Sequence, residues 1–497
     1  MLLNTSFTVK RILLPIILYC VILYSAQGMT IPSNEIWYTT IDGNVVRPNE
    51  LAFNDAILSN SYINGKGVIS FYGPINQIGN NAFADCSNLL SMQVPDGVSK
   101  IGKKAFSECS SLQSILLPNS VQLISDGAFE GCRNLIEINF PDSLVFIGYR
   151  AFKECCSLEE IILTDNVREI NGSAFSSCTS LKHIRLPNGL RTIEMSVFED
   201  CFNLQNIIIP DNVSIIEQRA FKNCKELTEV SLPSKLKLSS HEAFSGCLKL
   251  KRFIGSDLER EGRFLITEKG YLEAVASADL EELVLPEGIE SIAECAIAHT
   301  NLKRIIIPNG VHRIDDKAFA SNELLESIYI PETVTSIGGG ILAGCSKLGR
   351  IEGPLATKDN KSLVLKDVLV AIAPAGLKSF SVSSNVKKIG RMAFGSCTEL
   401  RNIKIPEGIT SIRENSFSNC KSLENLTLPE TLKYIKSGAF SGCESLTKIY
   451  VKATTPPQLE NSTEFDYIKV IRVPRKSAEI YKKEKNWRGY FDKIFVK

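Results

Sequence analysis

A 23-residue repeat is the feature that most constrains how this chain of 497 residues can fold. Cysteines recur at that spacing along two stretches of the sequence, at positions 86, 109, 132, 155, 178, 201, 224 and 247 and again at 397, 420 and 443. Each unit follows the pattern L-x-x-I-x-L-P-x-x-V-x-x-I-x-x-x-A-F-x-x-C, as in residues 112–132. Periods of about 20 to 29 residues with this pattern are typical of solenoids, in which each coil stacks on the next.

Within one unit, the local chemistry predicts two short strands and a return turn. Residues 112–117 form an extended segment that Pro118 ends, because proline lacks the N–H that a strand ladder needs. Residues 121–124 indicate a second strand, and residues 128–132 are expected to form a helical turn that returns the chain. We therefore expect a leucine-rich-repeat solenoid of about fourteen units, mostly β with short helical turns, with a parallel sheet along one face.

Departures from the repeat predict how the chain is divided. A solenoid needs polar lids at both ends, because each coil depends on its neighbours for burial and strand pairing. Two units are lengthened in a way that indicates an inserted β-hairpin in each. The expected segments are a signal peptide at 1–28, an N-terminal cap with a hairpin at 29–67, the solenoid at 68–451 with hairpin inserts near 255–283 and 353–380, and a C-terminal cap with a strand and a helix at 452–497.

The two caps carry local signals of their own. Asp42-Gly43 lies at the expected turn of the N-terminal hairpin. In the C-terminal cap, a strand around VIRVP precedes a helix for which Ser477 is the expected N-cap. The two tryptophans, Trp37 and Trp487, fall one in each cap, and both are expected to be buried against the terminal coils.

The first 28 residues have the layout of a secretory signal peptide. Lys10-Arg11 precede an apolar run, and Ala-Gln-Gly follows it with a small-x-small pattern that suits cleavage after Gly28. The run is short for a membrane span. We expect an exported protein with no membrane span in the mature chain. Three possibilities stay open for the exported chain: free secretion, a retained signal anchor, and lipidation at Cys20.

The repeat cysteines share one register and are expected to be buried thiols that fill the turn. Side chains in one column point the same way, whereas a disulfide needs a crossed geometry. One ligand per coil also makes a line and not a tetrahedron, so no metal site is predicted. Asn322 takes the place of cysteine in one coil. Cys156 and Cys295 lie outside the register, and the redox state of these two stays open.

No motif for catalysis or cofactor binding is present in the sequence. The four histidines share no metal-ligand spacing, and there is no G-x-S-x-G, H-E-x-x-H or Walker sequence. We therefore predict no catalytic residue, no metal ligand and no cofactor. The net charge of +1 gives no indication of nucleic-acid binding. A cryptic hydrolase would be supported by histidines or paired carboxylates that the fold brings together.

The outward side chains of the first strand are the expected binding surface. They alternate with the buried Leu and Ile and include aliphatic residues and tyrosine among charges, a mixture that often marks partner contact. The alternative is that β-branched residues simply favour strands. Arg304 and Arg350, near Tyr329, are the expected hot spots. The candidate partner-binding residues are Leu116, Ile162, Arg185, Ile208, Ile254, Arg304, Ile306, Tyr329, Arg350 and Tyr450.

The repeat IPDNVSIIEQRAFKNCKELTEV resembles the BspA-like, or Treponema-type, leucine-rich repeats over about residues 68–451. The segment VLVAIAPAGLKSF and the ending PPQ…IRVPRKSAEIYKKEKNWRGY look like those of surface proteins from Bacteroides-type bacteria. The resemblance implies a non-catalytic protein, secreted or on the outer surface of a bacterium. It also implies a protein partner, such as a host matrix or serum protein or a protein of a neighbouring cell. Glycan binding at the cell surface is the alternative.

Overall fold

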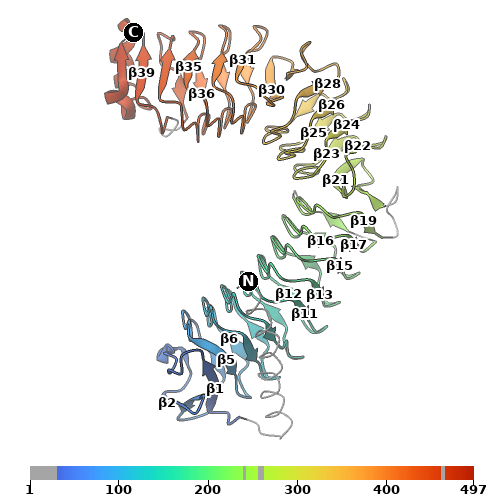
Figure 1. Ribbon diagram of the computed structural model, residues 1–497, viewed down its shortest axis with the longest axis vertical. Helices are drawn as coiled ribbons and strands as arrows, with labels where there is room; N and C mark the ends of the chain where they lie inside the picture. Colours follow the sequence, from blue (N-terminus) through green and yellow to red (C-terminus); the bar gives the residue numbers. More distant parts are fainter. Residues whose placement is uncertain (1–30, 235, 239–241, 256–261, 461–464, 497) are drawn as a thin grey trace, which may run out of the picture. The chain divides into compact units, whose positions relative to one another are not determined.

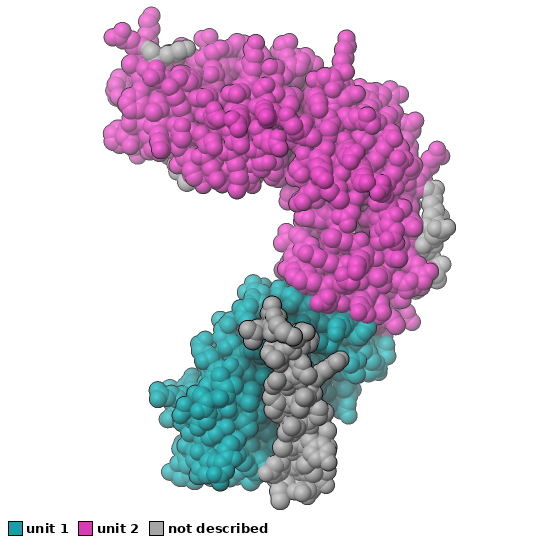
Figure 2. Space-filling model, in the orientation of Figure 1, with its two compact units in different colours: residues 1–190 teal, residues 191–497 magenta. Residues whose placement is uncertain are grey.

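The chain is described here by a computed structural model that covers residues 31–496 except 235, 239–241, 256–261 and 461–464. It consists of two compact units, Met1–Leu190 and Arg191–Lys497 (Figure 2). In each unit, the coils follow one another in chain order with their strands side by side (Figure 1). The expected signal peptide lies outside the described residues. None of the helices within the described ranges has the length and apolar character of a membrane span.

Unit 1 begins with an antiparallel cap. Its strands are β1 (Glu35–Thr40), β2 (Ile57–Ile63) and β3 (Lys66–Phe71), with a short 3-10 helix, η1 (Glu50–Ala52), before β2. The expected hairpin across Asp42-Gly43 is wrong, because β1 pairs with β3 on one edge and with the first repeat strand on the other. The hairpin lies instead between β2 and β3, at Asn64-Gly65. Both residues have positive φ, 51° and 81°, as a type I′ turn requires.

Five coils follow the cap in unit 1. The first strands pair in parallel within two sheets, one that contains the first three coils and one that contains the last two, and the second strands form one parallel ladder of their own. The first strands are β5 (Leu89–Gln93), β7 (Ser114–Leu116), β9 (Glu137–Ile138), β11 (Glu160–Ile162) and β13 (His183–Arg185). The second strands are β4 (Gln77–Ile78), β6 (Lys100–Ile101), β8 (Leu123–Ile124), β10 (Phe146–Ile147) and β12 (Glu169–Ile170).

Unit 2 continues the same two series. Its first strands are β15 (Asn206–Ile208), β17 (Glu229–Ser231), β19 (Arg252–Ile254), β22 (Glu282–Val284), β24 (Arg304–Ile306), β26 (Ser327–Tyr329), β28 (Arg350–Glu352), β31 (Ser379–Ser381), β33 (Asn402–Lys404), β35 (Asn425–Leu428) and β37 (Lys448–Val451). Its second strands include β14 (Thr192–Ile193), β16 (Ile215–Ile216), β18 (Lys237–Leu238), β23 (Ser291–Ile292), β25 (Arg313–Ile314), β27 (Ser336–Ile337), β32 (Lys388–Ile389), β34 (Ser411–Ile412), β36 (Tyr434–Ile435) and β38 (Gln458–Leu459).

Both expected hairpin inserts are confirmed. β20 (Phe264–Ile266) pairs antiparallel with β21 (Tyr271–Val275), and β29 (Ser362–Leu365) with β30 (Val368–Ile372). The second strand of each hairpin then pairs in parallel with the next coil, β21 with β23 and β30 with β32. Each hairpin therefore supplies the second strand of its own lengthened coil. The count of about fourteen units was too low: the described first strands number 16 from β5 to β37.

The return segment of each coil is a series of tight turns and not the expected helical turn. In residues 127–132 the helical geometry is interrupted by Gly127 and Gly131, with φ of 61° and 77°. These reversals turn the backbone so that the N–H of Phe129 donates to the carbonyl of Ala151 in the next coil, at 2.7 Å. The turn side thus has its own ladder between coils. Aromatic rings stack along it, with Phe106 and Phe129 centroids 5.1 Å apart.

The C-terminal cap extends the first-strand series with β39 (Val470–Val473) and β40 (Ile494–Val496). Between them lie η3 (Arg475–Ser477), α2 (Ala478–Lys483) and η4 (Arg488–Lys493). The strand and helix expected here are confirmed. Ser477 is at the N-cap position of α2, but its side chain makes no capping hydrogen bond. Its backbone already ends a 3-10 turn with αR geometry, whereas a capping side chain needs an extended backbone.

The two tryptophans differ in burial. Trp487 is fully buried as expected, and its Nε1 donates to the carbonyl of Pro457 at 2.7 Å. Trp37 is only half-buried, so its expected burial is wrong. Side chains alternate between the two faces of β1, and the residues on either side of Trp37 lie on the inner face. Trp37 lies on the outer face, under the ammonium group of Lys66 at 3.0 Å from the ring centroid.

Candidate binding surface

The side chains that point outward from the first strands form two columns in each unit. Parallel pairing places Ile162 of β11 beside Arg185 of β13 in unit 1. In unit 2 it aligns Ile208, Ser231 and Ile254 across β15, β17 and β19. The residue between the two outward positions of each of these strands is buried, since successive side chains of a strand alternate between faces. The columns expected from the repeat are therefore the columns of the structure.

One column of unit 2 is rich in exposed aliphatic side chains. Ile208 is 72% exposed and Ile254 is 41% exposed. Further along, Val284 pairs with Ile306, and Ile306 pairs with Tyr329. Val284, 57% exposed, was not selected from the sequence, although it has the same place in LEELVL that Ile306 has in LKRIII. We call these five residues the apolar column.

Ion pairs surround the tyrosine of the apolar column. The two expected hot-spot arginines flank Ser327 in the neighbouring column, and both contact Glu352. Arg350 Nε lies 2.7 Å from a Glu352 carboxylate oxygen. Arg304 makes longer contacts, 3.5 Å to Glu352 and 3.8 Å to Glu282, and its buried Nε has no hydrogen-bond partner among the described residues. Arg304 is therefore held less tightly by its carboxylates than Arg350 is.

The remaining candidates occupy separate places in the two units. In unit 1, Leu116 is half-buried and Ile162 is 58% exposed. Arg185 contacts Asp165 at 3.1 Å and the carbonyl of Leu163 at 3.2 Å. In unit 2, Tyr450 lies on β37, away from the apolar column, with Lys448 and Arg472 near its ring. The structure therefore brings together only part of the candidate set.

The cysteine column is confirmed as buried thiols. None of the fourteen described cysteines forms a disulfide. Within the column, most thiols donate to a phenylalanine carbonyl of the preceding coil, as Cys109 does to Phe83 at 2.9 Å and Cys132 to Phe106 at 3.1 Å, whereas Cys86 at the start of the column donates to the carbonyl of Arg47 at 3.6 Å. The thiol thus satisfies a carbonyl group that the turn leaves inside the fold.

The two cysteines outside the register are also thiols. Cys156 is half-buried and contacts the carbonyl of Ser177 at 3.6 Å. Cys295 is buried, and its Sγ lies 3.5 Å from a carboxylate oxygen of Glu242. Burial, followed by the nearby negative charge of Glu242, raises the pKa of the Cys295 thiol to about 12. Because the thiolate is the nucleophile, this thiol is inert at neutral pH.

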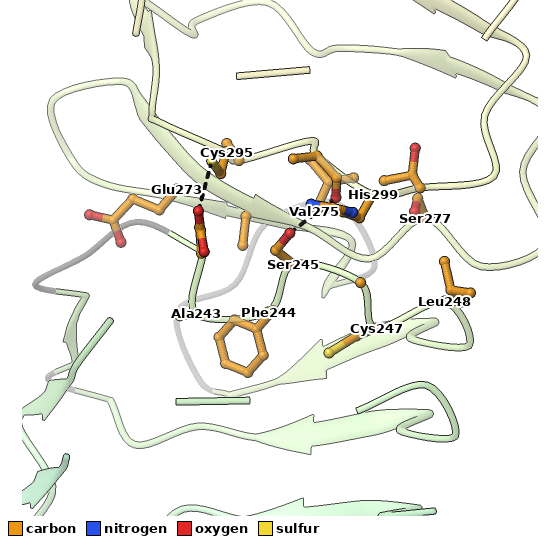
Figure 3. Close-up of a pocket in the computed structure, with 16 residues that line it drawn as sticks. Ala243, Phe244, Ser245, Cys247, Leu248, Glu273, Val275, Ser277, Cys295 and His299 are labelled. Atoms are coloured by element: carbon orange, nitrogen blue, oxygen red, sulfur yellow. Dashed lines mark hydrogen bonds between the residues drawn. The ribbon is translucent and has the colours of Figure 1, made fainter. Parts of the chain in front are cut away.

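A small pocket lies where the first inserted hairpin meets the preceding coil (Figure 3). Its lining includes Glu242, Glu273, Cys295 and His299, which sequence reasoning did not connect. The inserted hairpin lengthens the chain between two neighbouring coils. Hydrogen-bonded partners in these coils are therefore 53 positions apart, as in the bond from the Ser245 hydroxyl to the carbonyl of Ala298.

The pKa values of the titratable groups in the pocket are shifted in different directions. Burial would raise the pKa of Glu242, but hydrogen bonds from Lys222 and Arg219 outweigh it and lower that pKa to about 2. Burial raises the pKa of Glu273 to about 7 and lowers that of His299. The cavity volume is about 20 Å³, which is room for about one water molecule.

Metal binding and nucleophilic catalysis find no support in the pocket. Within the described ranges, no group of three or more His, Cys, Asp or Glu side chains is placed to hold a metal ion. No hydrogen bond joins Cys295 to His299 in this part of the chain, and the carboxylate beside the thiol, Glu242, is a weak base because its pKa is lowered to about 2. The pocket is best described as a gap in the stack that its own side chains nearly fill.

Comparison with known proteins identifies the repeat. A family model described as the BspA type leucine rich repeat region (6 copies) matches residues 57–169, 145–260, 273–364 and 373–483. No curated protein matches the chain significantly. The matched segments cover most of the chain, and the two gaps between them fall at the hairpin inserts, where β20 and β30 lie outside the matched residues.

Several solved structures are similar to this chain. A leucine-rich repeat protein from Bacteroides ovatus is 23% identical, with 88% of this chain and 90% of that chain covered and a TM-score of 0.39. A leucine rich cell surface protein from Faecalibacterium prausnitzii is 26% identical, with 83% and 89% covered and a TM-score of 0.44. The leucine rich repeat protein of Treponema pallidum is 22% identical, with 52% and 83% covered and a TM-score of 0.25.

The family model matches the residues over which the coils stack. The phenylalanine, the column cysteine and the two strands of the unit each have a defined structural role. The chain belongs to the BspA-type leucine-rich repeat family.

Proposed function

We propose that this chain is an exported, non-enzymatic scaffold that binds a protein partner through the apolar column of unit 2. The observation that carries the proposal is the exposure of aliphatic side chains at outward positions of two first-strand sheets of unit 2, led by Ile208 at 72% in one sheet and Val284 at 57% in the other. Apolar groups gathered in this way on a soluble surface often mark protein contacts. Export is supported by the signal-peptide pattern of residues 1–28.

The charges beside the apolar column fit a protein interface. Arg252 contacts Glu229 at 2.5 Å, and Lys303 contacts Glu281 at 2.7 Å. These ion pairs lie on the surface, so most of the charge around the column is already compensated. A partner can therefore cover the aliphatic side chains without burying a lone charge, which is the costly event at an interface.

Arg304 is the polar group best placed to add specificity. Its long contacts leave the guanidinium able to donate to a carbonyl or carboxylate of a partner. Tyr329, in the next strand, offers an aromatic ring beside it. Arg and Tyr are enriched among residues that dominate binding energy. The proposed partner is a protein of the host matrix or serum, or of a neighbouring cell, which the first experiment is designed to identify.

The test is binding of the purified protein to an array of matrix proteins, serum proteins and glycans at physiological salt. Once a ligand is found, Ile208→Ser with Ile254→Ser should weaken its binding at least tenfold. The matched control is Leu58→Ser with Ile480→Ser, which removes side chains of 55% and 53% exposure away from the column. Equal weakening by both pairs, or silence of all proteins on the array, would overturn the proposal.

A further inference from the structure

The outward face of the C-terminal coils differs in chemistry from the apolar column. Over β31, β33, β35 and β37 the outward side chains carry hydroxyl, amide, ammonium and phenol groups, and none is aliphatic. They are Ser379, Ser381, Asn402, Lys404, Asn425, Thr427, Lys448 and Tyr450. A protein interface typically has an apolar core, which this face lacks.

Four cations on this part of unit 2 have no carboxylate partner in the part of the chain that the structure describes. Among the described residues, no acidic oxygen lies within 4.0 Å of Lys404, Lys448, Lys469 or Arg472. This contrasts with Arg252, Lys303 and Arg350 in the coils of the apolar column, each of which contacts a carboxylate. Glu424, on the same face, lies only at the 4.0 Å limit from Arg401. The face therefore has a local excess of positive charge, although the whole chain is nearly neutral.

Two aromatic rings lie among these cations. On β37, the Lys448 ammonium is 4.9 Å from the ring centroid of Tyr450. Arg472 pairs with Tyr450 on one side and with Phe495 of β40 on the other. Phe495 is 50% exposed. Neighbouring strands are about 4.8 Å apart, so Lys404 and Arg472, three strands apart, span about 14 Å. We call Lys404, Lys448, Tyr450, Arg472 and Phe495 the basic face. Val470, the partner of Lys448 on β39, is the one aliphatic side chain at an outward position of the first-strand series from β31 to β39.

We infer that the basic face binds a sulfated polysaccharide. The unpaired cations supply charge for sulfate groups, and the planar guanidinium of Arg472 suits two oxygens of one sulfate. The rings of Tyr450 and Phe495 offer flat apolar surfaces on which the C–H face of a sugar can stack. Asn402 and Asn425 provide amide donors and acceptors for sugar hydroxyls. A row of spaced cations among polar side chains suits an extended polyanion better than it suits the apolar core of a protein interface. This site lies on other coils than the apolar column and does not depend on the function proposed for it.

The test uses heparin as the sulfated probe, with dextran as a neutral polysaccharide and poly-glutamate as an acidic polypeptide. Heparin should bind saturably at physiological salt, and its affinity should fall steeply as salt is raised, because exposed charges are screened. Lys448→Gln with Arg472→Gln should weaken heparin binding at least tenfold. Tyr450→Ala should weaken it severalfold without a change in the salt dependence.

The matched control is Lys182→Gln with Lys249→Gln, which removes the same charge from two exposed lysines already paired with carboxylates at 2.8 and 2.6 Å. Its heparin affinity should stay within twofold of the unchanged protein, and circular dichroism should show that both pairs are folded. Absence of saturable heparin binding, or equal loss in both pairs, would overturn the inference. Equal binding of poly-glutamate with the same sensitivity would assign the face to an acidic protein and overturn it as well.

Discussion

The side-chain amide of Asn322 donates to the carbonyl oxygen of Ile297 over 2.7 Å, in the place where other coils use a cysteine thiol. The next coil shows the usual form, with Cys345 donating to the carbonyl of Phe319 at 3.3 Å. Asn322 is fully buried, and its Oδ1 accepts from both the backbone N–H and the hydroxyl of Thr300 at 2.7 Å. The column therefore requires a donor and not a thiol as such.

The first prediction separates these two requirements. Asn322→Ala leaves the carbonyl of Ile297 and the donors of Thr300 unsatisfied inside the fold, so it should cost about 2–3 kcal/mol of stability. Asn322→Cys restores the donor found in the other coils and should cost about half as much. Amide hydrogen exchange of residues 296–302 would measure both effects locally. Equal loss of protection in the two variants would contradict the role assigned to the donor.

The second prediction concerns the stacked rings of unit 1. The ring of Phe129 lies between those of Phe106 and Phe152, with both centroid distances 5.1 Å. Phe129→Ala should therefore cost about 3–5 kcal/mol, the range for a large buried aromatic residue. Exchange protection should fall in the two adjacent coils as well, because coils depend on their neighbours. Phe202→Ala, at a half-buried position, is the control and should cost about 1 kcal/mol or less.

The third prediction concerns pH. Burial raises the pKa of Glu273 to about 7 from the ordinary value of 4.5. A raised folded-state pKa adds stability below pH 4.5, and that stability is lost as the pH rises through 7. Glu273→Gln should therefore stabilise the protein by about 1–2 kcal/mol at pH 8 and change little at pH 4. Melting temperature against pH would show this, with the exposed Glu268→Gln as the control.

The fourth prediction concerns the thiols. Burial raises the pKa of column cysteines, to about 12 for Cys247, so they should not react while the protein is folded. Half-buried Cys156 should react first, and Cys156→Ser should remove that early reaction. In denaturant without reductant, a thiol reagent should titrate all fourteen cysteines beyond residue 31. A count lower by two or more would contradict the absence of disulfides.

The repeat made most of the fold predictable. A period of fixed length places each buried residue in the same environment, so Phe129 and Cys132 could be assigned to the interior from spacing alone. Alternation along a strand likewise predicted that Ile208 and Ile254 face outward together. Both inserted hairpins were visible because their polar turns interrupt an otherwise constant pattern.

Features that depend on non-repeating contacts were not predictable in the same way. Asp42-Gly43 has hairpin chemistry, but both edges of the adjoining strand are occupied by other strands. Trp37 looked like a core residue, although its place in the alternation of β1 puts it outside. The helical turn expected at 128–132 gave way to residues with positive φ, which allow the backbone to bond to the next coil.

The candidate sites show the same division. The outward columns could be predicted from the repeat. The cations that lack a carboxylate partner among the described residues could not be predicted, because ion pairing depends on side chains one coil away. Lys448 and Arg472 are distinguished from Lys303 only by the absence of a facing carboxylate. The pocket at Glu242 was also hidden, since its residues meet only because a hairpin is inserted between their coils.

The inserted hairpins have a mechanical consequence. The apolar interior of unit 2 is divided at the second hairpin into one cluster that spans residues 272–373 and another that spans residues 369–494. The first-strand sheets of unit 2 also end and restart at the two hairpins, between β19 and β22 and between β28 and β31. Within unit 2, tension along the stack would therefore separate the coils at these seams. Such a molecule would extend under shear in blocks, with the coils inside each block still folded and able to hold a ligand.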